Sequence, residues 1–146
     1  MPLFRTRLAV GLICLVVIGL ELALMRSLSL RFWHHFAYMV ISVALLGFGA
    51  SGTALALLHS RILRAPRGWL AGLALAFSVS IPLMHRVASH VPLNVQFLSW
   101  DLGQAGYVLT LELVLLIPFF LGACAVGVVL MDRPELIGGH YAANLI

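Results

Sequence analysis

Four long apolar runs dominate this chain of 146 residues. They cover about residues 8–24, 36–58, 68–84 and 107–131. The hydrocarbon core of a bilayer is about 30 Å thick, and a helix that rises about 1.5 Å per residue crosses it with about 20 residues. Lipid offers no partner for free backbone N–H and C=O groups, so a crossing segment must be helical. The runs therefore predict an all-α membrane protein with four transmembrane helices, forming one multi-pass domain over residues 1–146.

Composition excludes a soluble globular enzyme. Hydrophobic residues make up 62% of the chain and charged residues only 10%, whereas soluble domains carry about 25% charged residues. The net charge of +4 comes from arginines that stand in small groups between the apolar runs. They form no continuous basic stripe that a phosphate backbone could follow. We therefore expect a lipid bilayer as the environment and no nucleic-acid partner.

The distribution of arginines predicts the orientation, because cytoplasmic loops carry an excess of positive residues. With a cytoplasmic N-terminus, six arginines lie inside and three outside. The inner set is Arg5, Arg7, Arg61, Arg64, Arg67 and Arg133, and the outer set is Arg26, Arg31 and Arg86. This excess favours a cytoplasmic N-terminus.

The segment between the third and fourth runs, about residues 85–105, is too polar to span a membrane. We expect the third run to close near Pro82 and an irregular interfacial segment with a short helix to follow. Trp100 is expected at headgroup depth, where amphipathic aromatic residues are enriched.

The second run contains the string GFGASG, with Gly47, Gly49 and Gly52. By letter it matches a dinucleotide-binding fingerprint, but that motif requires a turn between a strand and a helix. Inside an uncharged helix these glycines instead predict a small-residue strip that lets another helix approach closely. A hinge or a substrate-facing kink is the alternative.

Two residues near the end of the first run, Glu21 and Arg26, are charged. A charge inside a membrane is costly unless it is paired or faces water. Five positions separate them by about 140° around a helix, so they do not share a face. We expect partners on another helix, with His35 as a nearby titrating group. The set is either a structural polar clamp or part of a substrate or proton path.

The fourth run contains Glu112 and Pro118. Proline cannot donate a backbone hydrogen bond, so a carbonyl near residue 114 is left free. Glu21 and Glu112, on different helices, could form a site for a cationic substrate or a proton relay. Alternatively, Glu112 lies close enough to the interface to be half hydrated.

No motif predicts catalysis, a metal or a cofactor. The six histidines show no spacing typical of metal ligands. The chain also lacks a nucleophile elbow, a phosphate loop and a zinc signature. We therefore assign no catalytic residue, no metal site and no cofactor.

Three segments resemble the bacterial integral-membrane proteins related to spermidine synthase, the polyamine aminopropyltransferases. They read GLELALMRSLSLRFWHHFAYMVISVALLGFGASG, WDLGQAGYVLTLELVLLIPFFLGACAVGVVL and GGHYAANLI, in the family's order. The positions that match are Glu21, Arg26, His35, Gly47, Gly49, Gly52, Pro118, Phe119, Gly122, Tyr141 and Asn144. The resemblance implies a bacterial inner-membrane location and adds Pro118 and Gly122 to the expected packing residues.

In that family a membrane domain accompanies a soluble synthase-like domain, which would use decarboxylated S-adenosylmethionine. Asn144 stands where the family pattern suggests an acid. The chain ends at Ile146, where the family's next helix would begin, so we expect a truncated product or a fragment of a longer protein.

Two functions follow as expectations. In the first, the chain anchors a spermidine-synthase-like protein or helps to form a membrane path for a small cationic metabolite. In the second, it is a helix-packing assembly module of a larger membrane complex, without transport or catalysis. The expected partners besides lipid are further helices or a soluble synthase-like domain.

Overall fold

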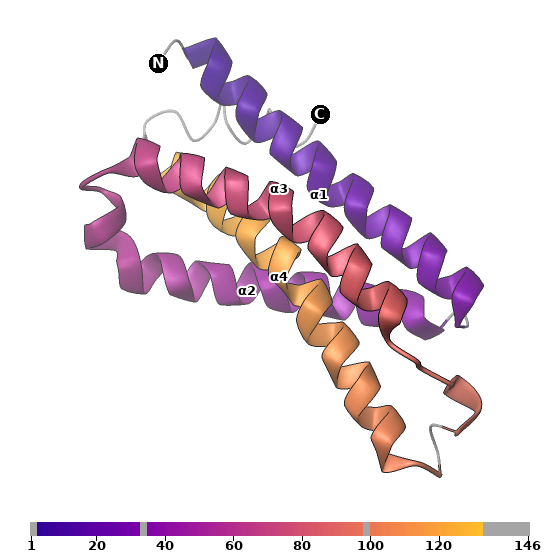
Figure 1. Cartoon of the computed structure of the whole chain (residues 1–146). Coiled ribbons are helices and arrows are strands. Elements are labelled where there is room, and N and C mark those ends of the chain that lie inside the picture. Colours follow the sequence, from indigo (N-terminus) through magenta and orange to yellow (C-terminus); the bar gives the residue numbers. More distant parts are fainter. Residues whose placement is uncertain (1–2, 33–34, 98–99, 133–146) are drawn as a thin grey trace.

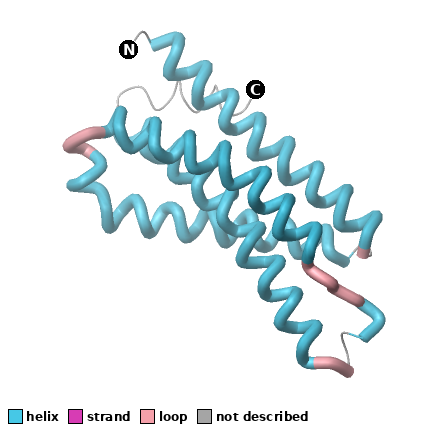
Figure 2. Tube along the Cα trace, in the orientation of Figure 1, coloured by secondary structure: helices cyan, strands magenta, loops and turns pink. Residues whose placement is uncertain are grey.

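The computed structural model describes residues 3–32, 35–97 and 100–132, and these ranges are helical with no strand (Figure 2). The element order is α1 (Leu3–Arg31), α2 (His35–Ile62), α3 (Pro66–His90), the short 3₁₀ helix η1 (Val95–Phe97) and α4 (Leu102–Asp132). The four α-helices are long and apolar enough to cross a membrane. The predicted all-α, multi-pass membrane fold is confirmed.

Consecutive helices run in opposite directions, as short connections require. In Figure 1 the α1–α2 connection and the α3–α4 loop lie at one end of the bundle, and the α2–α3 turn lies at the other. All four helices extend beyond the apolar runs from which they were predicted. This extension is expected because the polar flanking residues can continue a helix into the headgroup layer.

The last of the four helices, α4, is the centre of the bundle, because it contacts α1, α2 and α3. Within the described ranges, α1 and α3 make little direct contact with each other. Leu111, Leu115 and Phe119 of α4 are almost fully buried and share one apolar cluster with Val40 of α2 and Phe77 of α3. The core therefore follows the length of α4.

The prediction that the third helical segment closes near Pro82 is wrong, because α3 continues through Pro82 to His90. Proline fits the helical φ angle and removes a single donor, and membrane helices tolerate that loss. Val91, the first residue after the helix, has an extended backbone with φ of −70° and ψ of 116°. Pro92 follows directly, and a proline disfavours the helical region for the residue before it.

The irregular segment between α3 and α4 is shorter than predicted, because residues at both of its expected ends belong to helices. The backbone N–H of Asn94 donates to Gln104 Oε1 at 2.8 Å, which ties the loop to the start of α4. The N–H of Gly103 donates to Asp101 Oδ1 at 2.8 Å. Asp101 thus caps α4, and Trp100 beside it is 89% exposed.

Candidate functional site

Two glycines mark the points where helices approach most closely in the middle of the bundle. A Cβ atom placed on Gly47 of α2 would lie 2.9 Å from Phe119 Cβ and 3.0 Å from Phe120 N, both on α4. A Cβ on Gly122 of α4 would lie 2.8 Å from Val17 Cγ2 of α1 and 3.2 Å from Phe77 Cε2 of α3. Gly47 and Gly122 therefore allow α4 to pack against three helices.

The other two glycines of the expected strip differ from Gly47. A Cβ atom on Gly49 or Gly52 would meet no atom of the described residues within 4 Å. The close approach that the string GFGASG predicted is thus made within the chain by Gly47 and not by Gly49 or Gly52. Helix geometry explains the difference, because Gly49 lies about 200° around the helix from Gly47 and Gly52 about 140°.

The face of α2 that packs against the bundle has a regular spacing. It includes the buried residues Val40, Ala44, Gly47, Ser51 and Leu55. Steps of three and four residues keep a single helix face toward its neighbour.

Pro118, the remaining expected packing residue, is buried on α4 next to Phe119. Phe119 meets Phe48 of α2 edge to face at 6.3 Å between ring centroids.

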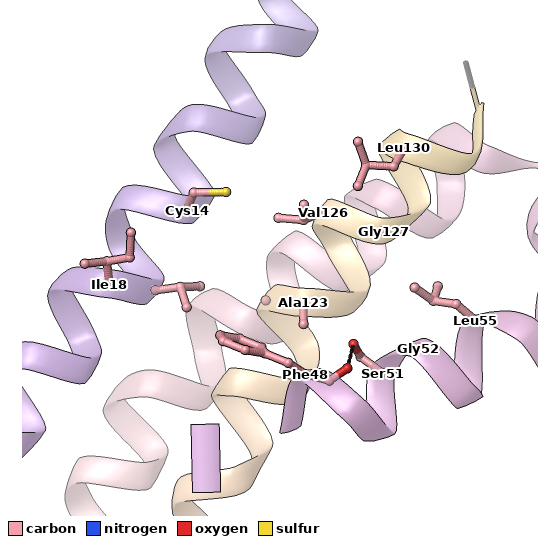
Figure 3. A pocket seen from close by; sticks show the side chains of 12 residues that line it. Cys14, Ile18, Phe48, Ser51, Gly52, Leu55, Ala123, Val126, Gly127 and Leu130 are labelled. Atoms are coloured by element: carbon pink, nitrogen blue, oxygen red, sulfur yellow. Dashed lines mark hydrogen bonds between the residues drawn. The ribbon is translucent and has the colours of Figure 1, made fainter. Parts of the chain in front are cut away.

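An open groove of about 470 Å³ lies between α1, α2 and α4 (Figure 3). Its lining comes from the middle of α1 and α2 and from the last third of α4, and none of the described residues that line it is charged. The lining residues are Cys14, Val17, Ile18, Phe48, Ser51, Gly52, Leu55, Gly122, Ala123, Val126, Gly127 and Leu130. The groove suits an apolar occupant and offers no site for an ion.

The only hydroxyl of the groove lining is satisfied locally. Ser51 Oγ donates to the backbone carbonyl of Phe48 at 2.7 Å, and this bond stays within α2. Ser51 therefore acts as a small residue on the groove wall. It leaves no unsatisfied donor in an apolar setting.

Several groove residues, among them Ala123 and Gly127, were not predicted from the sequence. Gly127 lies directly against Leu55 of α2. A detectable signal was present, because Ala123 and Gly127 stand four residues apart, the spacing of small residues at helix interfaces in membranes.

The charged candidates do not lie in this groove. Glu21 and Glu112 are half-buried and Arg26 is exposed. Within the described residues, no hydrogen bond or ion pair joins Glu21 to Arg26 or to Glu112. Glu21 lies ten residues before the end of α1 and Glu112 ten residues after the start of α4, so each is about 15 Å of helix from the same end of the bundle.

His35 is the first residue of α2, and its side chain lies outside the part of the chain that the structure describes. Tyr141 and Asn144 also fall outside the described residues. Among the described residues, no group of three or more histidine, cysteine or acidic side chains could hold a metal ion.

No protein-family model, curated protein or solved structure matches the chain. The resemblance to spermidine-synthase-like membrane proteins therefore stays a prediction from the sequence segments that carry it.

Proposed function

We propose that the protein is a membrane assembly module, which holds an apolar transmembrane helix of another chain in the groove between α1, α2 and α4. One observation carries the proposal: the groove is lined by apolar and small residues, with no charged side chain. In a bilayer, helices associate through close packing at small residues, because lipid is as apolar as leucine. Ser51, Gly52 and Ala123 provide such a surface.

The arginine distribution supports a cytoplasmic N-terminus for this module. The resemblance described above supports a bacterial inner-membrane location. It also supports a partner that belongs to a spermidine-synthase-like assembly, in which a soluble synthase-like domain carries the chemistry.

A photo-reactive amino acid at Ile18 tests the occupant of the groove. Ile18 lines the groove and is 53% exposed, so a substituted side chain there reaches the space without disturbing the core. Illumination of intact membranes should give one protein adduct of defined mass. The matched control is Leu75 on α3, which is 69% exposed and lies outside the groove.

The control at Leu75 should give lipid adducts only. Gly52→Leu, which fills the groove from α2, should remove the protein adduct at Ile18. Lipid adducts alone at Ile18 would show that acyl chains fill the groove and would contradict the proposal.

A membrane path for a small cationic metabolite is a second candidate. Its support is the half-burial of Glu21 and Glu112 within spanning helices, at a similar distance from the same end of the bundle. Carboxylates inside a membrane are costly and commonly functional.

Spermidine uptake into proteoliposomes tests this second candidate. Glu21→Gln and Glu112→Gln should each lower uptake at least about tenfold if the carboxylates carry the cation. Asp101→Asn is the control, because asparagine also caps a helix and the site is outside the spans. Equal uptake by all three variants and the parent protein would contradict the proposal of a cation path.

A further inference from the structure

A second open pocket, of about 490 Å³, lies where α3 ends against the first part of α4. From α3 it is lined by Leu83, Arg86, Val87 and His90. Leu83 and Val87 give the pocket apolar surface, and Val91 and Pro92 extend that surface beyond the end of the helix. Arg86 and His90 add polar groups among these residues, so the pocket combines apolar and cationic side chains, unlike the groove between α1, α2 and α4.

The opposite wall comes from Tyr107 and Thr110 of α4. Thr110 Oγ1 donates to the carbonyl of Gly106 at 2.8 Å, so only its lone pairs are available to a ligand. No hydrogen bond within the described ranges engages the hydroxyl of Tyr107, which is 38% exposed. Tyr107 can therefore donate to an oxygen of a ligand in the pocket.

The polar groups lie close to the end of α3. His90 is the last residue of α3, and Leu83 lies about 10 Å before it along the helix. A headgroup layer is about 5–8 Å thick on each side of the hydrocarbon core. We therefore expect Arg86 and His90, the polar rim of the pocket, in the headgroup layer and Leu83 at the edge of the hydrocarbon.

The rim is cationic and is not neutralised by the described acids. Arg86 is exposed, and no ion pair with a described carboxylate engages it. Asp101, in the loop before α4, accepts from the backbone N–H of Gly103 and caps that helix. His90 Nδ1 lies 2.7 Å from the carbonyl of Arg86. A carbonyl can only accept, so Nδ1 carries the proton and Nε2 remains for a ligand.

We propose that this pocket binds one anionic phospholipid. The guanidinium of Arg86 binds the phosphate, Tyr107 donates to a phosphate or ester oxygen, and an acyl chain lies along Leu83 and Val87. Arginine is suited to phosphate because its planar fork donates two parallel hydrogen bonds. A zwitterionic lipid has the same phosphate, but its positive headgroup would lie against Arg86. This inference does not depend on the proposed assembly function.

Native mass spectrometry of the purified protein tests the proposal, with phosphatidylglycerol and phosphatidylcholine offered together in detergent. The parent protein should retain one phosphatidylglycerol preferentially. Arg86→Gln should lower this retention about tenfold, because it removes a charge-assisted hydrogen bond. Arg64→Gln is the matched control, since Arg64 is also exposed but lies in the α2–α3 turn.

Arg64→Gln should retain phosphatidylglycerol like the parent protein. Equal loss in both arginine variants, or equal retention of the two lipids by the parent, would overturn the proposal. Tyr107→Phe removes a single oxygen and preserves the ring, so it keeps the test valid if Arg86→Gln folds poorly. It should lower retention about threefold, and unchanged retention would contradict the role of its hydroxyl in the proposal.

A further arm separates a lipid headgroup from a free phosphate. Soluble glycerol phosphate in excess should not displace the bound lipid, and Val87→Asn should weaken lipid retention by disturbing the acyl-chain wall. Displacement by glycerol phosphate, together with normal retention in Val87→Asn, would assign the pocket to a soluble phosphate and overturn the lipid assignment.

Discussion

Gly47 and Gly49 stand two positions apart on the same helix, yet their surroundings are opposite. A methyl group at Gly47 would collide with the backbone of α4, whereas one at Gly49 would enter open space. Both glycines look identical in an apolar segment that has no polar face. The comparison teaches that glycine in a membrane helix has a packing role only where a particular neighbour approaches it.

The largest expected effect is that of Gly47→Leu. Its Cβ would lie within about 3 Å of Phe119 Cβ and Phe120 N, and backbone atoms cannot move aside as a side chain can. We expect a loss of about 3 kcal/mol in the free energy of unfolding. Reversible SDS unfolding in mixed micelles, followed by tryptophan fluorescence, measures it. Unchanged stability would mean that α2 and α4 do not meet at Gly47.

Gly122→Leu should have an intermediate effect. The atoms nearest to its Cβ belong to the side chains of Val17 and Phe77, which can rotate or shift. We expect a loss of about 1–2 kcal/mol in the same unfolding measurement. A loss larger than that of Gly47→Leu would contradict the expectation that the side chains around Gly122 yield more easily than the backbone next to Gly47.

Gly49→Leu is the matched counterpart of Gly47→Leu and should leave stability unchanged or raise it by up to about 1 kcal/mol. Leucine has a higher helix propensity than glycine, and no atom of the described residues lies within 4 Å of the Cβ that it would add. A loss above about 1 kcal/mol would indicate that α2 is rotated about its axis relative to the structure described here. It would contradict the conclusion that Gly47 packs against α4 and Gly49 does not.

The smallest effect is expected for Ser51→Ala, beside the open Gly52. The hydroxyl of Ser51 donates only to the Phe48 carbonyl within its own helix. Polar contacts between membrane helices average about 0.6 kcal/mol, so a bond within one helix should contribute no more than that. A change above about 1 kcal/mol would point to a partner for Ser51 across the groove.

The overall fold was predictable from the sequence because bilayer thickness leaves few options for an apolar run of about 20 residues. The end of α3 was not, since Pro82 suggested a stop and the real stop is the pair Val91 and Pro92. Periodicity separates Gly47 from Gly49 only once the packed face of α2 is known, because Gly47 continues the spacing of the buried Val40 and Ala44, whereas Gly49 does not.

The candidate site was less predictable. In a soluble helix, polar residues reveal which face is exposed, but lipid-facing and protein-facing residues of α2 and α4 are both apolar. The groove therefore depends on which helices become neighbours. Glu21 and Glu112 were recognisable as isolated acids, but the sequence could not place them outside the groove.

The central position of α4 bears on how the protein assembles during synthesis. Domains and helices emerge from the ribosome in chain order, and α4 follows the three helices that it joins. Until α4 enters the bilayer, α1 and α2 can pack against each other, whereas α3 makes little contact with either of them in the described ranges. Tertiary structure is thus completed in a late step, and a ribosome that stalls before residue 102 would leave α3 inserted without the helix against which it packs.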